Sequence, residues 1–274
     1  MQEGLFYKIL IILLRSVKWN HRIRHMESSH LLKVFSILEA TAGKPAGVPL
    51  SELAALIGLP KSTAHRLLSM LCTLGYMAKS GNGVYRQTAM MKRLALGSND
   101  PYLVSVAQPI MVELNRVTQE TINLGFLRFE KIFYLHVIES TQTLRRMVSA
   151  QMSDPCFSTA MGRAIVAYLP EPRQRFLLRN AAIEKRTPKT VVDTAELKSI
   201  LANVARDGIA MEEDQTDLGV ACIAAPIFDR DGVVAAMSLS APTVRLQAAE
   251  LDQWRQLVRD GANAISLKLQ GEST

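Results

Sequence analysis

The sequence predicts an α+β protein built from two domains of unequal size. A chain of 274 residues exceeds the usual length of one domain, and its 48% hydrophobic and 21% charged residues are typical of a folded globular protein. Residues 31–74 contain three short runs with helical apolar spacing, followed by a turn-rich hairpin pattern. Strand-like apolar runs appear repeatedly beyond residue 120. We therefore expect a small helical N-terminal domain and a larger mixed C-terminal domain.

Two short helices are predicted at the start of the N-terminal domain. The apolar residues at helical spacing, which we expect to pack inward, are Leu31, Val34, Phe35 and Leu38 in the first helix and Leu50, Leu53, Ala54 and Ile57 in the second. Gly43 and Pro45 end the first helix. Ser51 is expected to cap the second helix, and Gly58 permits the sharp turn that follows it.

A third helix is predicted from Pro60, which suits a first helical turn, to about Leu74. Its expected buried stripe consists of Ala64, Leu67, Leu68, Leu71 and Leu74. The residues left on the open face are Lys61, Ser62, His65, Arg66, Ser69 and Thr73. An open face of donors without acidic residues suits a DNA groove, because backbone N–H groups at the helix start can meet phosphate while Arg66 reaches base edges.

A hairpin is predicted around the turn-rich tip at residues 80–83, with Lys79 and Arg86 placed to lie beside phosphates. Charge supports the same function, since residues 1–100 carry 13 Lys and Arg against 5 Asp and Glu, whereas residues 101–274 carry 19 against 20. Each helix alone is equally well explained as an ordinary core helix. The ordered combination predicts a winged helix-turn-helix that binds double-stranded DNA over residues 26–88.

The stretch PLSELAALIGLPKSTAHRLLSMLCTLGYM resembles the winged helix of the IclR family, in which a GLPKST-type segment begins the recognition helix. The resemblance implies a transcriptional repressor or activator. It places Lys61, Ser62, Thr63, His65 and Arg66 in the DNA-contacting region. Ser69, Lys79 and Arg86 join that predicted set from the open helix face and the hairpin.

A linker helix is predicted over residues 89–100, and the second domain over residues 101–274. Its expected helices are 102–117, 193–206 and 243–269, and its expected strands are 122–129, 133–138, 219–228 and 233–239, the last two joined by a turn at 229–232. The last helix is expected to cover the sheet or a partner subunit.

Two segments of this domain, CFSTAMGRAIVAYLP and IAMEEDQTDLGVACIAAPIFDRDGVVAAMSLSAP, resemble the IclR effector domain. The resemblance implies a GAF-like fold, a curved antiparallel sheet with flanking helices. It assigns the effector pocket to Ala160, Met161, Glu212, Cys222, Ser238 and Ser240, with Glu212 in an acidic turn. Met161 replaces a smaller residue of some family members and is expected to narrow the pocket.

The residues themselves fit a small-molecule site of this kind. Ser158 or Thr159 can cap the helix that follows them, whose free N–H groups favour an anion. Period two puts Ser238 and Ser240 on one strand face, where two hydroxyls can hydrogen-bond a small carboxylate. The alternatives are a plain helix cap, serines that bond only backbone carbonyls, and an acidic cluster, comprising Glu212, Glu213, Asp214 and Asp217, that is merely a solvated turn.

The resemblance implies a symmetric homodimer or homotetramer that binds a palindromic operator, with an organic or aromatic acid effector that changes operator affinity. The alternative is an enzyme that uses Cys222, Cys156 or the acidic cluster. It is weaker, because His136 is the only histidine after residue 100 and no nucleotide loop or GxSxG motif is present. No cofactor or metal is expected, since His21 and His25 lack a third ligand nearby.

Residues 1–25 form an extension before Met26. Its apolar run, residues 5–14, is too short to span a bilayer, and the basic residues follow the run instead of preceding it as in a secretory signal. The extension is interpreted as the product of a start codon assigned too early, or as an interfacial amphipathic segment of a membrane-associated protein. Three dispersed cysteines favour a reduced, cytoplasmic location without stable membrane insertion.

Overall fold

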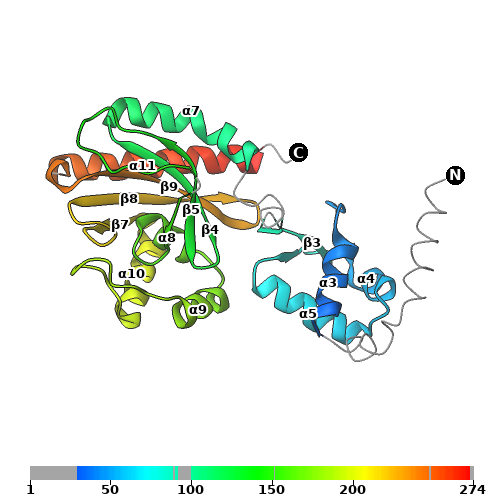
Figure 1. Cartoon of the computed structure of the whole chain (residues 1–274). Coiled ribbons are helices and arrows are strands. Elements are labelled where there is room, and N and C mark those ends of the chain that lie inside the picture. The colour runs from blue at the N-terminus through cyan, green and yellow to red at the C-terminus, as the bar shows by residue number, and fades with distance from the viewer. Residues whose placement is uncertain (1–29, 89, 92–99, 151, 247, 272–274) are drawn as a thin grey trace, which may run out of the picture. The chain divides into compact units, whose positions relative to one another are not determined.

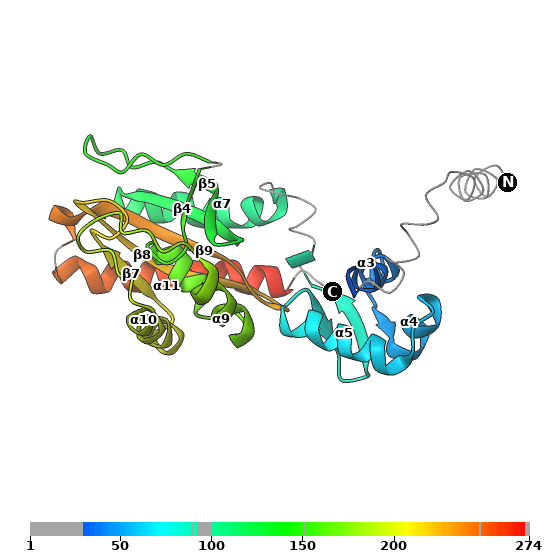
Figure 2. The same ribbon diagram turned by 60° about the horizontal axis from the view of Figure 1, so that its bottom comes forward.

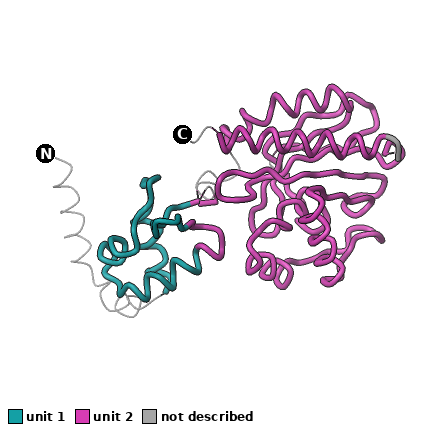
Figure 3. Tube along the Cα trace, turned by 180° about the vertical axis from the view of Figure 1, so that it is seen from behind, with its two compact units in different colours: residues 1–71, 79–87 teal, residues 72–78, 88–274 magenta. Residues whose placement is uncertain are grey.

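The computed structural model describes residues 30–88, 90–91, 100–150, 152–246 and 248–271. Its contacts divide the chain into two compact units, one comprising residues up to Leu71 together with Lys79–Gln87, the other Cys72–Ala78 and Thr88 onward (Figure 3). The predictions for residues 1–25 and for most of the linker, residues 92–99, lie outside the described residues. None of the described helices is both long enough and apolar enough to cross a membrane.

Three helices and a small sheet make up the N-terminal part of the described chain. In chain order the elements are α3 (His30–Thr41), β1 (Val48–Pro49), α4 (Leu50–Leu56), α5 (Lys61–Thr73), β2 (Met77–Lys79) and β3 (Val84–Gln87). The strands form one sheet in the order β1-β3-β2. This succession of helix, helix, turn, helix and hairpin confirms the predicted winged helix-turn-helix.

The predicted inward face of the first helix is wrong for two of its four residues, while Val34 and Leu38 are half-buried. Leu31 and Phe35 are 65% and 54% exposed, whereas Ile37 and Thr41 are buried. Apolar residues occur on more than one side of α3, so their spacing alone did not identify the side that packs. Thr41 can be buried because its hydroxyl donates a hydrogen bond to the carbonyl oxygen of Ile37 at 2.9 Å.

The predicted cap of the second helix is also wrong. Ser51 lies inside α4, and the N-cap residue is Pro49, which makes no side-chain cap hydrogen bond. Pro49 pairs with Val84 across the sheet, so the strand runs directly into the helix and leaves no room for a separate cap. Gly58 has a φ of +65°, as the predicted turn requires. Leu74 lies one residue beyond α5 and is half-buried.

The C-terminal unit is a six-stranded antiparallel sheet with helices on both faces. Its elements are α7 (Pro101–Thr118), β4 (Thr121–Arg128), β5 (Lys131–Ile138), β6 (Ser153–Pro155), α8 (Ala160–Val166), α9 (Glu171–Asn180), α10 (Thr194–Asp207), β7 (Ala210–Glu213), β8 (Val220–Asp229), β9 (Gly232–Pro242), the 3-10 turn η1 (Thr243–Arg245) and α11 (Ala248–Gly271). The strand order is β6-β5-β4-β9-β8-β7. The predicted strands and long helices are present, while β6, β7 and α9 were not predicted.

Side-chain alternation separates the two faces of this sheet. Ile122 and Leu124 point into a core formed with α7 and α11, together with Val258. The intervening Asn123 belongs to the opposite face, where α8 packs with buried side chains such as Ile165. Figures 1 and 2 show α7 and α11 on one side of the sheet and α8, α9 and α10 on the other. The polar residues of the predicted pocket lie on the α8 side.

Candidate functional site

The open face of α5 is exposed to solvent as the sequence predicts. Ala64, Leu67, Leu68 and Leu71 are buried on the opposite side of the helix. The exposed predicted residues are Lys61, Ser62, His65, Arg66 and Ser69, and Thr63 is half-buried. A helix anchored by four apolar side chains therefore presents hydroxyl, imidazole and cationic groups together, without an acidic residue.

Side-chain contacts orient the basic groups of this unit. The Nη2 atom of Arg66 lies 2.8 Å from Nε2 of His30, near the start of α3, and both side chains are exposed. The ammonium group of Lys79 lies over the ring of Tyr85, 5.7 Å from its centroid, which ties this end of β2 to β3. Arg86 is half-buried on β3. The basic residues thus lie on α5 and on both strands of the hairpin.

The first residues of α8 are held close against the chain that precedes them. The hydroxyl of Thr159 accepts a hydrogen bond from the backbone N–H of Gly162 at 3.1 Å, so Thr159 is the N-cap residue. A Cβ added to Gly162 would lie 1.9 Å from the carbonyl oxygen of Cys156, which shows how closely the two backbones approach. Ala160 and Met161 are both buried at this start of the helix.

A continuous row of polar side chains crosses four neighbouring strands on the α8 face. Asn123 on β4 donates from Nδ2 to the hydroxyls of Ser238 and Ser240 on β9, at 3.2 and 3.1 Å. The Ser240 hydroxyl lies 3.2 Å from Sγ of Cys222 on β8, and Cys222 is the register partner of Glu212 on β7. We call these five side chains the polar row. All of them are buried, and Asn123 was not predicted.

Glu212 does not lie in a solvated acidic turn. It is a residue of strand β7 with 2% exposure, and its Oε2 accepts hydrogen bonds from the backbone N–H groups of Gln215 and Thr216 at 3.0 and 3.2 Å. Its other oxygen, Oε1, is buried without a hydrogen-bond partner among the described residues. Burial raises the pKa of this carboxyl above its ordinary value, although the Cys222 thiol, the two N–H groups and Arg163 oppose the shift.

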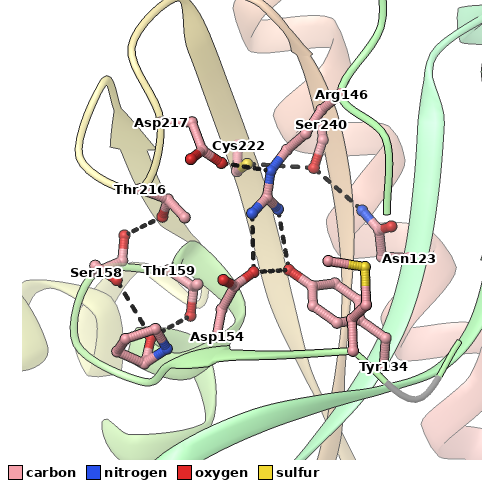
Figure 4. Close-up of polar contacts among 12 residues, drawn as sticks. Asn123, Tyr134, Arg146, Asp154, Ser158, Thr159, Thr216, Asp217, Cys222 and Ser240 are labelled. Atoms are coloured by element: carbon pink, nitrogen blue, oxygen red, sulfur yellow. Dashed lines mark hydrogen bonds and ion pairs between the residues drawn. The ribbon is translucent and has the colours of Figure 1, made fainter. Parts of the chain in front are cut away.

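Beside the polar row lies a network of two arginines, two aspartates and a tyrosine. Figure 4 shows four of its members, Tyr134, Arg146, Asp154 and Asp217. Apart from Asp217, which belongs to the acidic cluster of the sequence, none was predicted. Arg146 donates to Asp217 from Nε at 3.0 Å, to the Tyr134 hydroxyl from Nη1 at 3.0 Å and to Asp154 from Nη2 at 2.8 Å. Arg186 bonds both aspartates, at 2.8 Å to Asp154 and 3.4 Å to Asp217. Burial opposes the ionisation of Asp154, but Arg146 holds the pKa of this carboxyl below its ordinary value.

Comparison with known proteins assigns the chain to a family. The model of the bacterial transcriptional regulator IclR C-terminal domain matches residues 98–267, and that of the IclR helix-turn-helix domain matches residues 31–81. The chain belongs to the IclR family. IclR-family proteins are DNA-binding transcriptional regulators with a C-terminal effector-binding domain, and this regulator has both parts.

Individual relatives agree with this assignment. The HTH-type transcriptional regulator KdgR of Escherichia coli is 33% identical over 245 residues, which cover 88% of this chain and 92% of KdgR. The crystal structure of the C-terminal domain of E. coli KdgR has a TM-score of 0.56 at 31% identity, covering 61% of this chain and 98% of that one. An IclR homologue from Microbacterium hydrocarbonoxydans, complexed with 4-hydroxybenzoate, shares the fold at 22% identity and a TM-score of 0.57, covering 87% and 98%.

The two cysteines considered as nucleophiles are poorly suited to that task in this IclR-family chain. Burial raises the pKa of the Cys156 thiol to about 12, and that of Cys222 rises well above its ordinary value, again through burial and then through Glu212. Only the thiolate is an effective nucleophile, so burial disfavours both groups as nucleophiles near neutral pH. The named relatives are transcriptional regulators.

The buried Glu212 makes the stability of this regulator depend on pH. Folding raises the pKa of the Glu212 carboxyl. Protonation of Glu212 therefore stabilises the folded protein at pH values below the pKa of the unfolded state. This contribution is lost as the pH rises through the pKa of the folded state. We expect Glu212→Gln to unfold at a higher temperature than the wild type at pH 8, with the difference shrinking toward pH 4. The neutral amide oxygen can still accept the N–H groups of Gln215 and Thr216.

Thermal denaturation of both proteins across this pH range measures the effect. Glu213→Gln is the matched control, because the Glu213 side chain is 58% exposed one residue further along the same strand. A constant difference between Glu212→Gln and the wild type at every pH would contradict the prediction.

Proposed function

We propose that this IclR-family regulator binds operator DNA through the open face of α5 and the β2–β3 hairpin. The observation that carries this proposal is the composition of that face, on which exposed Lys61, Ser62, His65, Arg66 and Ser69 lie together with no acidic residue. Hydroxyl and cationic groups of this kind bond phosphates and base edges. Thr63 on the same helix, with Lys79 and Arg86 on the hairpin, completes the proposed DNA-binding set.

We further propose that the polar row and the start of α8 together bind a small organic or aromatic acid that changes operator affinity. The proposed effector-binding residues are Ala160, Met161, Glu212, Cys222, Ser238 and Ser240. The 4-hydroxybenzoate held by the Microbacterium homologue is an aromatic acid and supports this class of ligand. A homodimer or homotetramer would present two recognition helices to a palindromic operator, and a coupling of about 1–3 kcal/mol would change affinity roughly 5- to 150-fold.

Replacing Arg66 with Ala tests the DNA-binding proposal. We expect operator affinity to fall by about 1–3 kcal/mol if Arg66 reads a base. If it contacts only phosphate, affinity should fall similarly for all sequences, and the dependence of log affinity on log salt should flatten by about 0.9. Genomic fragments retained by the wild-type protein supply the probe, and fluorescence anisotropy at several salt concentrations measures both quantities.

Arg179→Ala is the matched control, because Arg179 is an exposed arginine on α9 in the other unit. It should bind the same fragments as the wild type does. Circular dichroism should show both variants folded, since Arg66 is exposed and contacts only His30 among the described hydrogen-bond partners. An Arg66→Ala protein with unchanged affinity and salt dependence would show that α5 does not read DNA through this face.

A further inference from the structure

The polar row ends at both sides in an acceptor atom without a donor. Oδ1 of Asn123 and Oε1 of Glu212 are each buried and have no hydrogen-bond partner among the described residues. Both side chains are almost wholly buried, at 0% and 2% exposure, and their other polar atoms are engaged. Buried acceptors are normally satisfied, so these two atoms point to a ligand that brings hydroxyl donors.

A guanidinium group lies beside the same row. Arg146 comes from the connection between β5 and β6, and its side chain is only 10% exposed. Its charge acts on Cys222 at the centre of the row strongly enough to oppose the rise in the pKa of that thiol. Figure 4 shows Arg146 together with Cys222, Ser240 and Asn123 in one cluster. An arginine in such a place matches the planar geometry of a carboxylate.

The two aspartates bound to Arg146 are held very differently. The Asp154 side chain is 8% exposed and accepts from Arg146, Arg186 and Tyr134, each at 2.8 Å. The Asp217 side chain is 43% exposed, and its two arginine contacts are longer, at 3.0 and 3.4 Å. Asp217 belongs to the connection between β7 and β8 and is therefore the carboxylate that a ligand can replace without opening the core.

We propose that Arg146 selects the effector, which is a carboxylate bearing at least one hydroxyl group. The ligand carboxylate takes the place of Asp217 on Arg146, and Asp154 keeps the guanidinium oriented. The ligand hydroxyl donates to Oδ1 of Asn123 or to Oε1 of Glu212. This inference rests on the proposed function in one respect, which is that the polar row is part of the effector pocket.

Asp217 then acts as an internal competitor of the ligand. When Asp217 is present, an incoming carboxylate must displace the ion pair between Asp217 and Arg146. When the Asp217 carboxylate is removed, a simple carboxylate can occupy the vacated position beside Arg146. The Asp217→Ala variant removes the side-chain carboxylate and should therefore respond to acetate, which is small enough to occupy the position of the missing group. The same variant with Arg146→Gln lacks the receptor and should not respond.

Thermal denaturation of the full chain with sodium acetate, against sodium chloride at equal ionic strength, tests this arrangement. We expect the unfolding midpoint of Asp217→Ala to rise with acetate but not with chloride. The wild type and the double variant Arg146→Gln/Asp217→Ala should respond equally to the two salts. Arg146→Lys with Asp217→Ala keeps the charge without the planar fork and should give a smaller rise. Equal responses of Asp217→Ala to both salts, or an acetate response that survives Arg146→Gln, would overturn the inference.

Hydroxy acids separate this inference from the proposed function. The probes are 4-hydroxybenzoate and lactate, each paired with its neutral amide, and the readout is binding affinity together with operator affinity. We expect acids to bind the wild type better than the amides, with a loss of about 10- to 100-fold in Arg146→Gln.

Acids that change operator affinity equally in the wild type and in Arg146→Gln would leave the proposed function standing and reject the role of Arg146. The converse outcome is an acetate response that depends on Arg146 in a protein whose operator affinity does not change when acids bind. That outcome would support Arg146 as the carboxylate receptor and reject the proposed regulation.

Discussion

Replacing Gly162 with alanine should destabilise the C-terminal unit by about 3 kcal/mol or more, the upper range for overpacking a core. The added Cβ would lie 1.9 Å from the Cys156 carbonyl oxygen and 2.5 Å from its Cα, so it meets backbone atoms that no rotamer change can remove. Either α8 or the chain at Cys156 must shift. Urea denaturation followed by Trp254 fluorescence, in a Trp19→Phe background, measures the loss, because Trp254 lies buried on α11.

Gly271→Ala is the matched control. Gly271 is also helical, at the end of α11, and nothing lies within 4 Å of a Cβ built there. Its stability should equal or slightly exceed that of the wild type, since alanine favours helix more than glycine does. An unfolding midpoint for Gly162→Ala that matches this control would show that a Cβ at position 162 does not clash with the Cys156 carbonyl oxygen.

The open face of α5, which we propose binds DNA, could be predicted from the sequence because its information is local. Four buried residues of α5 recur at helical spacing within one short helix, which leaves only one face for Arg66 and its polar neighbours. The same rule failed for α3, where Leu31 and Phe35 share a helical stripe and yet are exposed. Spacing identifies which residues share a face, and only tertiary contacts decide which face is covered.

The proposed effector site could be predicted only in part. The resemblance supplied Ser238, Ser240 and Cys222, and two-residue alternation correctly placed the serines on one face of β9. Asn123 left a signal that was overlooked, since it is a lone polar residue between Ile122 and Leu124 in a buried strand.

The arginine network left no comparable local signal. Arg146 and Asp217 are 71 residues apart and come from connections with no regular pattern, so only the folded sheet brings them together.

Replacing Arg163 with methionine should cost about 2–4 kcal/mol of stability. Arg163 is 1% exposed on α8 and donates to the Phe157 and Met211 carbonyl oxygens at 2.8 and 3.2 Å and to Oε1 of Gln215 at 2.5 Å. Methionine fills much of the same volume but removes all three of these hydrogen bonds, and Oε1 of Gln215 keeps only the one donated by the Val191 N–H at 3.3 Å. Part of this loss is offset, because burying a charged guanidinium costs free energy that methionine avoids. The lowered pKa of Arg163, caused by burial, reflects that desolvation cost.

Urea denaturation of Arg163→Met, Arg163→Lys and Arg179→Met separates these contributions. Arg179→Met is the control, since Arg179 is exposed on α9, and it should leave stability unchanged. Arg163→Lys keeps the charge but not the fork that reaches three acceptors, so most of the loss should persist. An Arg163→Met protein at least as stable as the wild type would mean that the desolvation of the cation outweighs its hydrogen bonds.

The position of Arg163 gives its loss a consequence beyond stability. Its bonds join α8 to the end of β7 and to Gln215, and the same helix carries the proposed ligand residues Ala160 and Met161. It also opposes the raised pKa of Glu212, so without it that carboxyl should hold its proton to a higher pH. The stability of Arg163→Met should therefore decline more steeply than that of the wild type as pH rises from 4 to 8. In Arg163→Met/Glu212→Gln this added pH dependence should disappear, because the group that titrates is gone.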